Sequence, residues 1–320
     1  MLDAEYVVPF RGTADSDLAD LAGYLGGLVD IVDVTVVDGS DPVLVEDHRR
    51  LLDRRVRVIE PTPRPGRNGK VRGVVTGAES ARHERIVLAD DDVRYDERML
   101  RRVVSMLDDA DLVRPQNHFV PQPWHARWDT ARSLLNRAVG SDWPGTFAVR
   151  RAALLTTGGY DGDVLFENLE LVRTLRAAGG HECVAPDVFV ARRPPTVSHF
   201  LGQRIRQAYD SFAQPTRFAA ELALLPLIAW AARRPVRLVV LAAVAVSVAE
   251  VGRRRSAGAR VFPATASLWA PAWLVERAVC VWLALILRLR GGVRYSEGRL
   301  VRAATPSRTL HRRFGGPIPR

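Results

Sequence analysis

Short apolar segments alternate with longer segments of helical spacing over the first two thirds of this 320-residue chain. The apolar segments have the length of β-strands and lie at 6–10, 31–37, 56–59, 86–89 and 112–113. The segments between them carry apolar residues every three or four positions, as one face of a helix requires, at 16–28, 43–52, 71–81 and 98–107. This alternation predicts an α/β fold with a mostly parallel sheet covered by helices on both faces.

Charge and hydropathy divide the chain into two regions. Residues 1–214 carry 28 basic and 32 acidic side chains, whereas residues 215–320 carry 18 basic and 4 acidic ones. The second region also holds apolar runs at about 218–232, 236–251 and 261–287. Arginines beside apolar helices are typical of a protein held at an anionic membrane rather than of a nucleic-acid-binding protein. We therefore predict an α/β domain over 1–214, a membrane-associated helical region over 215–320, and no nucleic-acid partner.

The topology of the second region stays open at this point. None of its apolar runs offers the ~20 uninterrupted apolar residues that a spanning helix ordinarily needs. Arg233, Arg234 and Pro235 end the first run, and Glu276 and Arg277 interrupt the third. Basic clusters flank the third run on both sides, so a single crossing would leave one cluster on the outer side. A hairpin, an interfacial helix and a soluble bundle all remain alternatives. We expect the α/β domain to lie on the cytoplasmic side of the cell membrane.

Acidic residues follow two of the predicted strands. Asp38 follows 31–37, and Asp90, Asp91 and Asp92 follow 86–89. The carboxyl ends of parallel strands meet at one edge of the sheet, where ligands bind in such folds. Side chains alternate along an extended segment, so Asp90 and Asp92 should point to one side and Asp91 to the other. Paired carboxylates suit a hard divalent cation that also binds phosphate. The alternative is a solvated strand end that leads into a helix.

Several segments resemble the family 2 glycosyltransferases, which have the GT-A fold, in order and spacing. They are VVPF at 7–10, VVDGSD at 36–41, NGKVRGVVTGAESA at 68–81, LADDDV at 88–93, GTFAVRRAALLTTGGYDGDVLFENLEL at 145–171 and HFLGQRIRQAY at 199–209. The branch that the chain most resembles is membrane-bound and lipid-directed, and it includes the ceramide glucosyltransferase-like enzymes. This resemblance implies transfer of one sugar, with inversion, from a UDP- or GDP-sugar to a membrane lipid or other membrane-presented acceptor, with Mg²⁺ or Mn²⁺.

The resemblance also implies roles for individual residues. Asp38 corresponds to the residue that contacts the nucleobase, Asp90 to the ribose and metal-side residue, and Asp92 to the direct metal ligand. The implied donor-binding set is Asp38, Lys70, Asp90, Asp91, Gln203 and Arg206. Lys70, the only lysine of the chain, stands where the family has a lysine near the nucleotide or its phosphates; otherwise it is an ordinary exposed lysine. Arg206 would bind the diphosphate as a fork, or lie on a solvated helix face.

The sequence departs from the family at the catalytic base. An inverting transferase needs a carboxylate that takes the proton of the acceptor hydroxyl. The family has a Glu-Asp pair there, whereas this chain has Glu167 and Asn168, and an amide is not a base. Three interpretations remain: Glu167 serves as the base, Glu170 serves from the same helix face, or the chain is a non-catalytic nucleotide-sugar- or glycan-binding relative.

Aromatic residues suggest where the acceptor binds. The family's QxxRW element ends in Gln207 here, and loss of that tryptophan favours transfer of one sugar over processive synthesis. Trp124 and Trp128 lie in a segment that the general family pattern does not explain, and aromatic rings beside polar groups suit contact with a sugar. Packing at the sheet edge is the alternative. His199 is a further acceptor-side candidate that would orient the Gln203–Arg206 segment.

Overall fold

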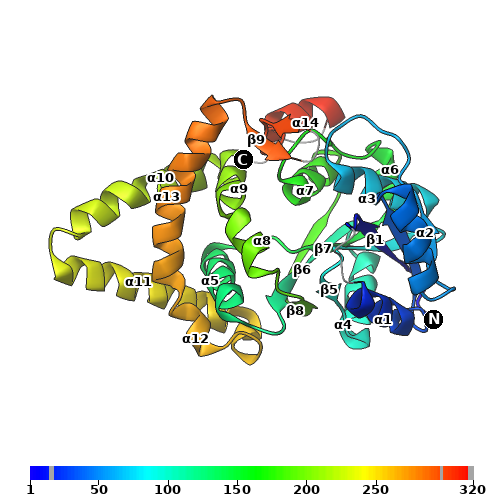
Figure 1. Ribbon diagram of the computed structural model, residues 1–320, viewed down its shortest axis with the longest axis horizontal. Coiled ribbons are helices and arrows are strands. Elements are labelled where there is room, and N and C mark those ends of the chain that lie inside the picture. The colour runs from blue at the N-terminus through cyan, green and yellow to red at the C-terminus, as the bar shows by residue number, and fades with distance from the viewer. Residues whose placement is uncertain (14–17, 296–297, 316–320) are drawn as a thin grey trace.

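The computed structural model describes residues 1–13, 18–295 and 298–315. Its centre is an eight-stranded sheet of order β3-β2-β1-β4-β7-β6-β8-β5 (Figure 1). The strands are β1 Glu5–Phe10, β2 Asp33–Asp38, β3 Arg57–Ile59, β4 Arg85–Ala89, β5 Val93–Arg94, β6 Leu112–Phe119, β7 Thr146–Arg150 and β8 Glu182–Arg192. The α/β fold with a mostly parallel sheet is thus confirmed.

Strand direction places the predicted acidic residues at one edge of the sheet. β1 pairs in parallel with both β2 and β4, and β2 pairs in parallel with β3. The register sets Phe10 of β1 opposite Asp38 of β2. β7 runs antiparallel to β4 and β6, whereas β6 and β8 run parallel to each other. The carboxyl ends of β2 and β4 therefore lie at the same edge, as the sequence predicted.

Polar side chains cap the free backbone N–H groups of three of the four early helices. The four helices are α1 Ala19–Leu28, α2 Pro42–Leu51, α3 Gly69–Ser80 and α4 Glu97–Ser105. Asp41, Asn68 and Asp96 accept hydrogen bonds from backbone N–H groups in the first turns of α2, α3 and α4. Such caps satisfy donors that have no partner inside the helix. The predicted start of the first helix, at Ser16, lies outside the described residues.

Two glycines let α3 lie close to β1. A Cβ atom on Gly73 would stand 2.8 Å from Cβ of Pro9, and one on Gly77 would overlap the side chain of Val7. Because glycine has no Cβ, the helix axis approaches the strand more closely than a larger residue would allow. This approach holds Lys70, in the first turn of α3, over the carboxyl edge of the sheet.

Helices cover both faces of the sheet and create two apolar cores. On one face, Tyr6 and Val8 pack with Leu25 of α1 and Leu100 of α4. On the other face, Val7 joins a second core, because neighbouring side chains of a strand point to opposite sides. That core also contains residues of α3 and of α6 and α7. The helices that follow the early part of the sheet are α5 Trp124–Val139, α6 Arg151–Thr156, α7 Glu167–Ala177, α8 Val197–Gly202 and α9 Arg204–Tyr209.

The basic second region forms a helical extension on one side of the sheet domain. Its elements are α10 Pro215–Ala231, α11 Pro235–Arg254, α12 Ala264–Ser267, α13 Ala270–Leu289, β9 Val293–Tyr295, β10 Gly298–Leu300 and α14 Ser307–Phe314. Figure 1 shows α10 and α11 projecting from the body as a hairpin, with α13 crossing its base. The predicted interruption at Arg233–Pro235 is the turn of this hairpin.

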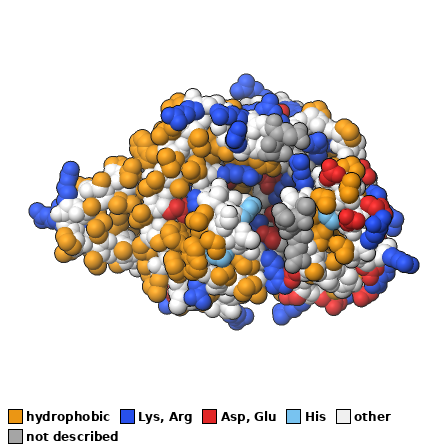
Figure 2. Space-filling model, viewed as in Figure 1, with side chains coloured by type: hydrophobic (Ala, Val, Ile, Leu, Met, Phe, Trp, Pro, Cys, Tyr) orange, Lys and Arg blue, Asp and Glu red, His pale blue; other side chains and the backbone are white. Residues whose placement is uncertain are grey.

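Two segments of this region are long and apolar enough to cross a membrane. They are Pro235–Arg260, with mean hydropathy 1.9, and Ala264–Leu289, with mean hydropathy 1.7. By length and composition, these two segments are stronger candidates for membrane spans than the interrupted apolar runs in the sequence suggested. Many of their apolar side chains are exposed, and Figure 2 shows apolar surface over much of the extension.

The two regions share a core. Leu169 of α7 and Tyr209 of α9 pack in one cluster with Cys280 of α13 and with Leu300 and Ala303 near the C-terminus. Helix α13 also contacts α9 and α5. The division between residues 214 and 215 therefore stays a prediction, since continuous packing joins the two sides of it.

Candidate active site

A cavity of about 740 Å³ lies at the carboxyl edge of the sheet, between the α/β domain and the helical extension. Figure 2 shows the opening as a hollow with charged side chains around it. Among the described residues that line it, nine are arginine or lysine, and four are acidic: Asp90, Asp91, Glu167 and Asp210. Gly69, Gly73, Trp143 and Tyr295 contribute further to its wall. The cavity is therefore strongly basic.

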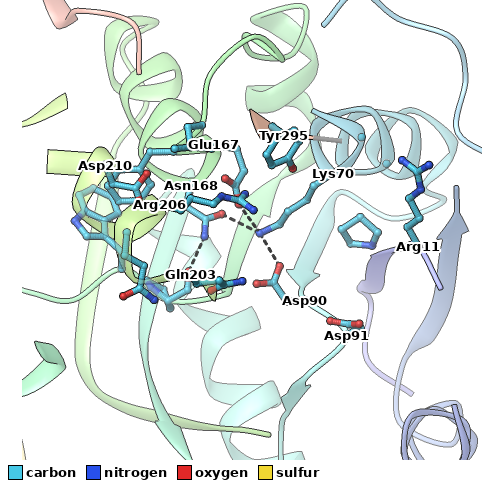
Figure 3. Close-up of a pocket in the computed structure, with 18 of the residues that line it drawn as sticks. Arg11, Lys70, Asp90, Asp91, Glu167, Asn168, Gln203, Arg206, Asp210 and Tyr295 are labelled. Atoms are coloured by element: carbon cyan, nitrogen blue, oxygen red, sulfur yellow. Dashed lines mark hydrogen bonds and ion pairs between the residues drawn. The ribbon is translucent and has the colours of Figure 1, made fainter. Parts of the chain in front are cut away.

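Lys70 joins two carboxylates in this cavity (Figure 3). Its Nζ lies 2.6 Å from Oδ1 of Asp90 and 2.8 Å from Oε1 of Glu167. Burial lowers the pKa of Lys70, but the charges of Asp90 and Glu167 outweigh burial and raise that pKa above its ordinary value. The Lys70 side chain therefore remains an ammonium at neutral pH, and it is partly buried between two carboxylates rather than fully exposed.

Arg192, at the end of β8, binds the first and third aspartates of the triplet. Its Nε lies 2.7 Å from Oδ2 of Asp92, and its Nη2 lies 3.3 Å from Oδ2 of Asp90. Arg192 thus contacts both Asp90 and Asp92, whereas the described cavity wall includes Asp90 and Asp91 but not Asp92. Gly145 leaves room for this arrangement, because a Cβ there would stand 2.6 Å from Oδ2 of Asp90.

The triplet is short of positive charge even with Arg192 present. Burial and the charge of Asp90 raise the pKa of Asp91. Burial, together with the charges of Asp90 and Asp91, raises the pKa of Asp92 to about 6 despite Arg192. Within the described part of the chain, Oδ1 of Asp92 is buried without a hydrogen-bond partner. A divalent cation would relieve the repulsion between these neighbouring carboxylates and would satisfy the unpaired oxygen.

The described residues hold no ready-made cluster of three or more His, Cys, Asp or Glu side chains for a metal. Lys70 and Arg192 occupy oxygens of Asp90 and Asp92 that could otherwise serve as ligands. The carboxylates present thus fit a divalent cation that takes its remaining ligands from phosphate oxygens or water, as Mg²⁺ commonly does. They do not form a self-sufficient protein cage.

The other predicted donor-side residues lie at different depths. Asp38 is only 1% exposed, and its carboxylate contacts Nδ1 of His48 at 2.6 Å and accepts the backbone N–H of Ser40 at 2.9 Å. Its neighbour Gly39, rather than Asp38 itself, lines the cavity. Gln203 and Arg206 both line the cavity, and the Arg206 guanidinium stacks 4.5 Å from the ring centre of Tyr295.

The two candidate bases, Glu167 and Glu170, have separate environments. Glu167 and Asn168 line the cavity, and the Asn168 amide donates to the carbonyl of Pro144 at 3.0 Å. Glu170 is fully buried and accepts the backbone N–H of Thr305 at 2.6 Å. Burial raises the pKa of Glu170. One turn of helix thus separates a carboxylate in the cavity from a carboxylate in the protein interior.

The predicted acceptor-side residues lie next to the cavity rather than in its described wall. Trp124 and Trp128 pack edge-on against Phe200, and Nε1 of Trp128 donates to Glu276 at 2.8 Å. His199 contacts Gln203 through Nε2. The two tryptophans therefore pack α5 against α8, and Trp128 also connects α5 to α13. Their contacts in this structure are packing contacts, which was the alternative to sugar binding.

The sequence analysis missed Asp210, which lies just after α9 and faces the cavity (Figure 3). Its Oδ1 is buried and has no hydrogen-bond partner among the residues that the structure describes. Burial raises the pKa of Asp210 to about 7 against the charge of Arg206, and the charge of Glu167 raises it further. Its position directly after the family-like segment at 199–209 was the only signal in the sequence. Arg192 was missed as well, although it follows an apolar strand.

We expect Asp210→Asn to stabilise the protein in a pH-dependent way. The pKa of about 7 in the folded state lies above the ~3.9 of an unfolded chain, so folding favours the protonated form. Stability therefore falls as pH rises from about 4 to about 7, and ionisation costs up to about 4 kcal/mol. Asparagine is never ionised, so its advantage in thermal unfolding should be absent at pH 4 and complete at pH 8.

The matched control for that comparison is Asp187→Asn, which removes an exposed carboxylate paired with Arg102 at 2.6 Å. This variant should show no stability gain that grows with pH. A difference between wild type and Asp210→Asn that stays constant from pH 4 to pH 8 would contradict an ionisation near neutral pH.

The sequence of the chain defines its class. Residues 27–210 match the family described as glycosyltransferase-like family 2. The chain therefore belongs to that family and is a glycosyltransferase. No curated protein matches the chain in sequence.

Solved structures agree on the fold. The mannosyltransferase PcManGT from Pyrobaculum calidifontis, in complex with GDP-Man and Mn²⁺, is 20% identical, with a TM-score of 0.51. The match covers 88% of this chain and 87% of that one. Glucosyl-3-phosphoglycerate synthase from Mycobacterium tuberculosis, with phosphoglyceric acid, is 16% identical over 61% of this chain and 74% of that one, with a TM-score of 0.42. The first of these similarities identifies the fold as GT-A-like.

Proposed function

We propose that this glycosyltransferase moves one sugar, with inversion, from a UDP- or GDP-sugar to a lipid or other acceptor at a membrane. The observation that carries this proposal is the contact of Lys70 with both Asp90 and Glu167. Asp90 belongs to the aspartate triplet after β4, which corresponds to the donor side. Glu167 begins α7, in the segment that corresponds to the acceptor side. The Lys70 ammonium thus contacts both the proposed donor side and the proposed acceptor side of one cavity.

The membrane location is supported by the composition of the helical extension. Exposed apolar side chains cover α11 and α13, including Val239, Val244 and Leu289. The cavity also takes Arg217 from α10 and Arg277 from α13 into its wall. An acceptor held by these helices would therefore reach the cavity directly. We place the chain in the lipid-directed branch of the family, with its α/β domain on the cytoplasmic face.

The donor is proposed to bind with Mg²⁺ or Mn²⁺ held by Asp90 and Asp92. The solved PcManGT complex contains Mn²⁺ and GDP-Man, which supports this choice. The cation would supply charge neutralisation for the diphosphate leaving group. Lys70 and Arg206 add fixed positive charge around the diphosphate, and such charge stabilises a leaving group whose negative charge grows in the transition state.

Glu167 is the residue that we propose as the base. An acceptor hydroxyl oxygen attacks the anomeric carbon, the bond from that carbon to the nucleoside diphosphate breaks, and Glu167 takes the hydroxyl proton. Lys70 orients one oxygen of Glu167 through its 2.8 Å contact. Asn168 holds the adjacent backbone through its bond to Pro144 and takes no proton. Glu170 contributes to folding through the Thr305 amide.

Turnover of donor tests this function. Detergent-solubilised protein with Mn²⁺ should release nucleoside diphosphate from at least one UDP- or GDP-sugar, and should release it faster with membrane lipid extract present. The competing function, a nucleotide-sugar-binding relative without activity, is motivated by Asn168. Donor binding by calorimetry without metal-dependent turnover on any common UDP- or GDP-sugar would favour that alternative.

Removal of divalent metal should abolish transfer. With EDTA we expect the rate to fall by at least about 10²-fold, because several kcal/mol of leaving-group stabilisation are lost. Added Mn²⁺ or Mg²⁺ should restore the rate, and calorimetry should show tighter donor binding with metal than without. Full activity in EDTA would show that the basic side chains lining the cavity suffice without a metal.

A further inference from the structure

Trp143 is an aromatic residue of the cavity wall that has no part in the reaction proposed above. It lies in the turn 142–145, between α5 and β7. The guanidinium carbon of Arg114 lies 4.3 Å from the ring centre of Trp143, and the ring of Phe166 meets it edge-on at 5.3 Å. Arg114 is not among the described residues of the cavity wall, so the face that it covers points away from the cavity. The remaining surface of the half-buried indole contributes to the wall.

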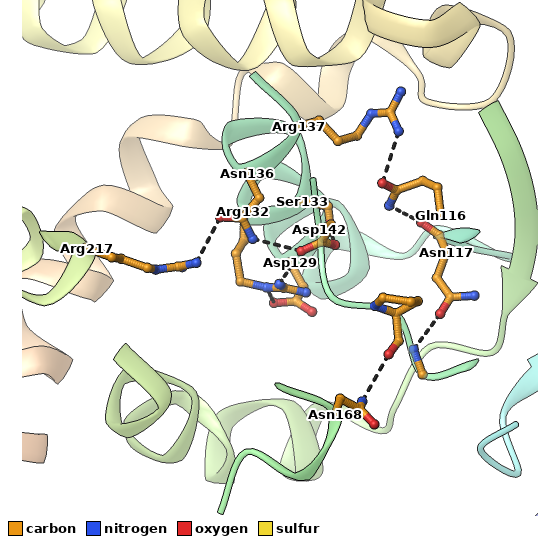
Figure 4. A network of polar contacts seen from close by, with 12 residues as sticks. Gln116, Asn117, Asp129, Arg132, Ser133, Asn136, Arg137, Asp142, Asn168 and Arg217 are labelled. Atoms are coloured by element: carbon orange, nitrogen blue, oxygen red, sulfur yellow. Dashed lines mark hydrogen bonds and ion pairs between the residues drawn. The ribbon is translucent and has the colours of Figure 1, made fainter. Parts of the chain in front are cut away.

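Polar contacts on both sides of Trp143 hold the turn 142–145 in place (Figure 4). The carboxylate of Asp142 accepts hydrogen bonds from three side chains of α5, which are Arg132 at 2.8 Å, Asn136 at 2.8 Å and Ser133. After Trp143, the backbone N–H of Gly145 donates to Oδ1 of Asn117 at 2.7 Å. A ring that is already fixed loses little conformational freedom when a ligand binds against it.

Two oxygens without hydrogen-bond partners lie on the neighbouring wall of the cavity. Gln207 of α9 and Asp210 both line it, and residues three apart share one face of a helical turn. Within the described residues, Oε1 of Gln207 and Oδ1 of Asp210 are buried and make no hydrogen bond. Trp143 packs against the apolar cluster that contains Ala208 and Tyr209 of α9, so the ring and the two oxygens belong to one end of the cavity. Buried polar atoms are normally hydrogen-bonded, and a ligand with hydroxyl donors would satisfy both oxygens.

The arginines at this end of the cavity already have carboxylate partners. Nη1 of Arg132 lies 2.8 Å from Oδ1 of Asp142, and Nε of Arg217 lies 2.8 Å from Oε1 of Glu221. Their charges are therefore balanced within the protein, and a ligand here does not need to be an anion. An aromatic ring beside hydrogen-bonding oxygens suits a sugar, which has apolar C–H groups on its faces and hydroxyl donors on its rim.

The order of side chains along the cavity places this end on the acceptor side. Figure 3 shows Lys70 between Arg11 on one side and Glu167 and Asp210 on the other. Lys70 contacts Asp90 of the proposed donor side, and Glu167 is the proposed base. Asp210 thus lies on the side of the base that a donor held at Asp90 leaves free.

We propose that Trp143, Gln207 and Asp210 form a subsite for a pyranose ring of the acceptor, so that the acceptor is an already glycosylated molecule rather than a lipid without a sugar. The C–H face of the pyranose stacks on Trp143, and two of its hydroxyls donate to Gln207 and Asp210. This inference rests on the proposed function, because it names the acceptor class of that same cavity. The attacking hydroxyl then belongs to this sugar, and its proton passes to Glu167.

Octyl glycopyranosides and 1-octanol test the proposal, because they share the alkyl chain and differ by the sugar. The glucoside, galactoside and mannoside are offered to the full chain in a zwitterionic detergent that contains no sugar, with Mn²⁺ and each common UDP- or GDP-sugar. Wild type should transfer to at least one octyl glycoside at least about tenfold faster than to 1-octanol. A buried oxygen left without its hydroxyl partner costs about that factor.

Substitutions at the subsite should change acceptor binding alone. Trp143→Leu and Gln207→Leu should each raise the KM for that glycoside at least about fivefold, with donor KM and donor hydrolysis by water unchanged. Trp143→Phe keeps an aromatic ring and should raise this KM less than about threefold. Donor hydrolysis at the wild-type rate shows that the variants are folded. Trp230→Leu, at an exposed tryptophan of α10 that stacks with Arg237, is the control and should match wild type.

Transfer to 1-octanol as fast as to every octyl glycoside overturns the proposal. A rise in donor KM with an unchanged acceptor KM also overturns it, because the sugar of the donor would then lie against Trp143. Calorimetric titration with the octyl glycosides gives a readout independent of turnover, and Trp143→Leu and Gln207→Leu should bind at least about fivefold more weakly than wild type. If wild type binds a glycoside without turning over any donor, the proposed function fails and the subsite stands. If donor is turned over and no glycoside binds, the subsite fails alone.

Discussion

Replacing Asp90 with asparagine is expected to lower kcat/KM for sugar transfer by at least about 10³-fold. Asp90 contacts Lys70 at 2.6 Å and Arg192 at 3.3 Å, and it is proposed to hold the metal. An amide has no charge to balance these cations and is a poorer ligand for a divalent ion. The measurement is initial-rate kinetics with saturating Mn²⁺, together with calorimetric donor binding.

The control for this substitution is Asp47→Asn, which changes an exposed carboxylate on α2 that pairs only loosely with Arg50. It should retain the wild-type rate. The Asp90→Asn protein should also unfold at a temperature close to that of wild type, so that lost activity reports on the site. Activity within tenfold of wild type would remove Asp90 from the donor site.

Glu167→Gln and Glu170→Gln should have opposite consequences. We expect Glu167→Gln to lower kcat by about 10²–10⁴-fold with donor binding retained, which is the usual effect of losing a general base. Glu170→Gln should change kcat by less than about threefold, because its carboxylate is buried away from the cavity. It should instead lower the free energy of unfolding by about 1–3 kcal/mol, since its charged hydrogen bond to Thr305 is weakened.

Equal losses of kcat in both variants would contradict the separate environments of these two residues. Full turnover of Glu167→Gln would show that no base is needed at that position. Asp210→Asn would then test whether Asp210, which also lines the cavity, serves as the base.

Much of the fold could be predicted from the sequence, because its determinants are local. The apolar runs at 6–10 and 86–89 match the observed strands β1 and β4, each of which begins one residue earlier. Asp41, Asn68 and Asp96 cap helices directly, as their position before helical segments allows. Parallel pairing then brought Asp38 and Asp90 to one edge, so the place of the site followed as well.

The charge partners of the site could not be predicted in this way. Arg192 lies about a hundred residues from Asp90 and Asp92, and Arg277 lies 56 residues from Glu221. A sequence shows these arginines as ordinary basic residues, because burial and partners depend on how distant helices pack. The same holds for Asp210, whose raised pKa comes from burial and from its neighbours across the cavity.

The sequence by itself determined the α/β class, the family, the aspartate triplet at the sheet edge and a basic apolar C-terminal region. Only the tertiary structure decided which carboxylate enters the cavity. Glu167 and Glu170 lie within one turn of α7, and helical spacing alone treats them as equivalent. The backbone N–H of Thr305, from the far end of the chain, holds Glu170 in the interior, whereas Lys70 holds Glu167 toward the cavity. Contacts between distant parts of the chain thus bury Glu170 in the interior and leave Glu167 facing the cavity.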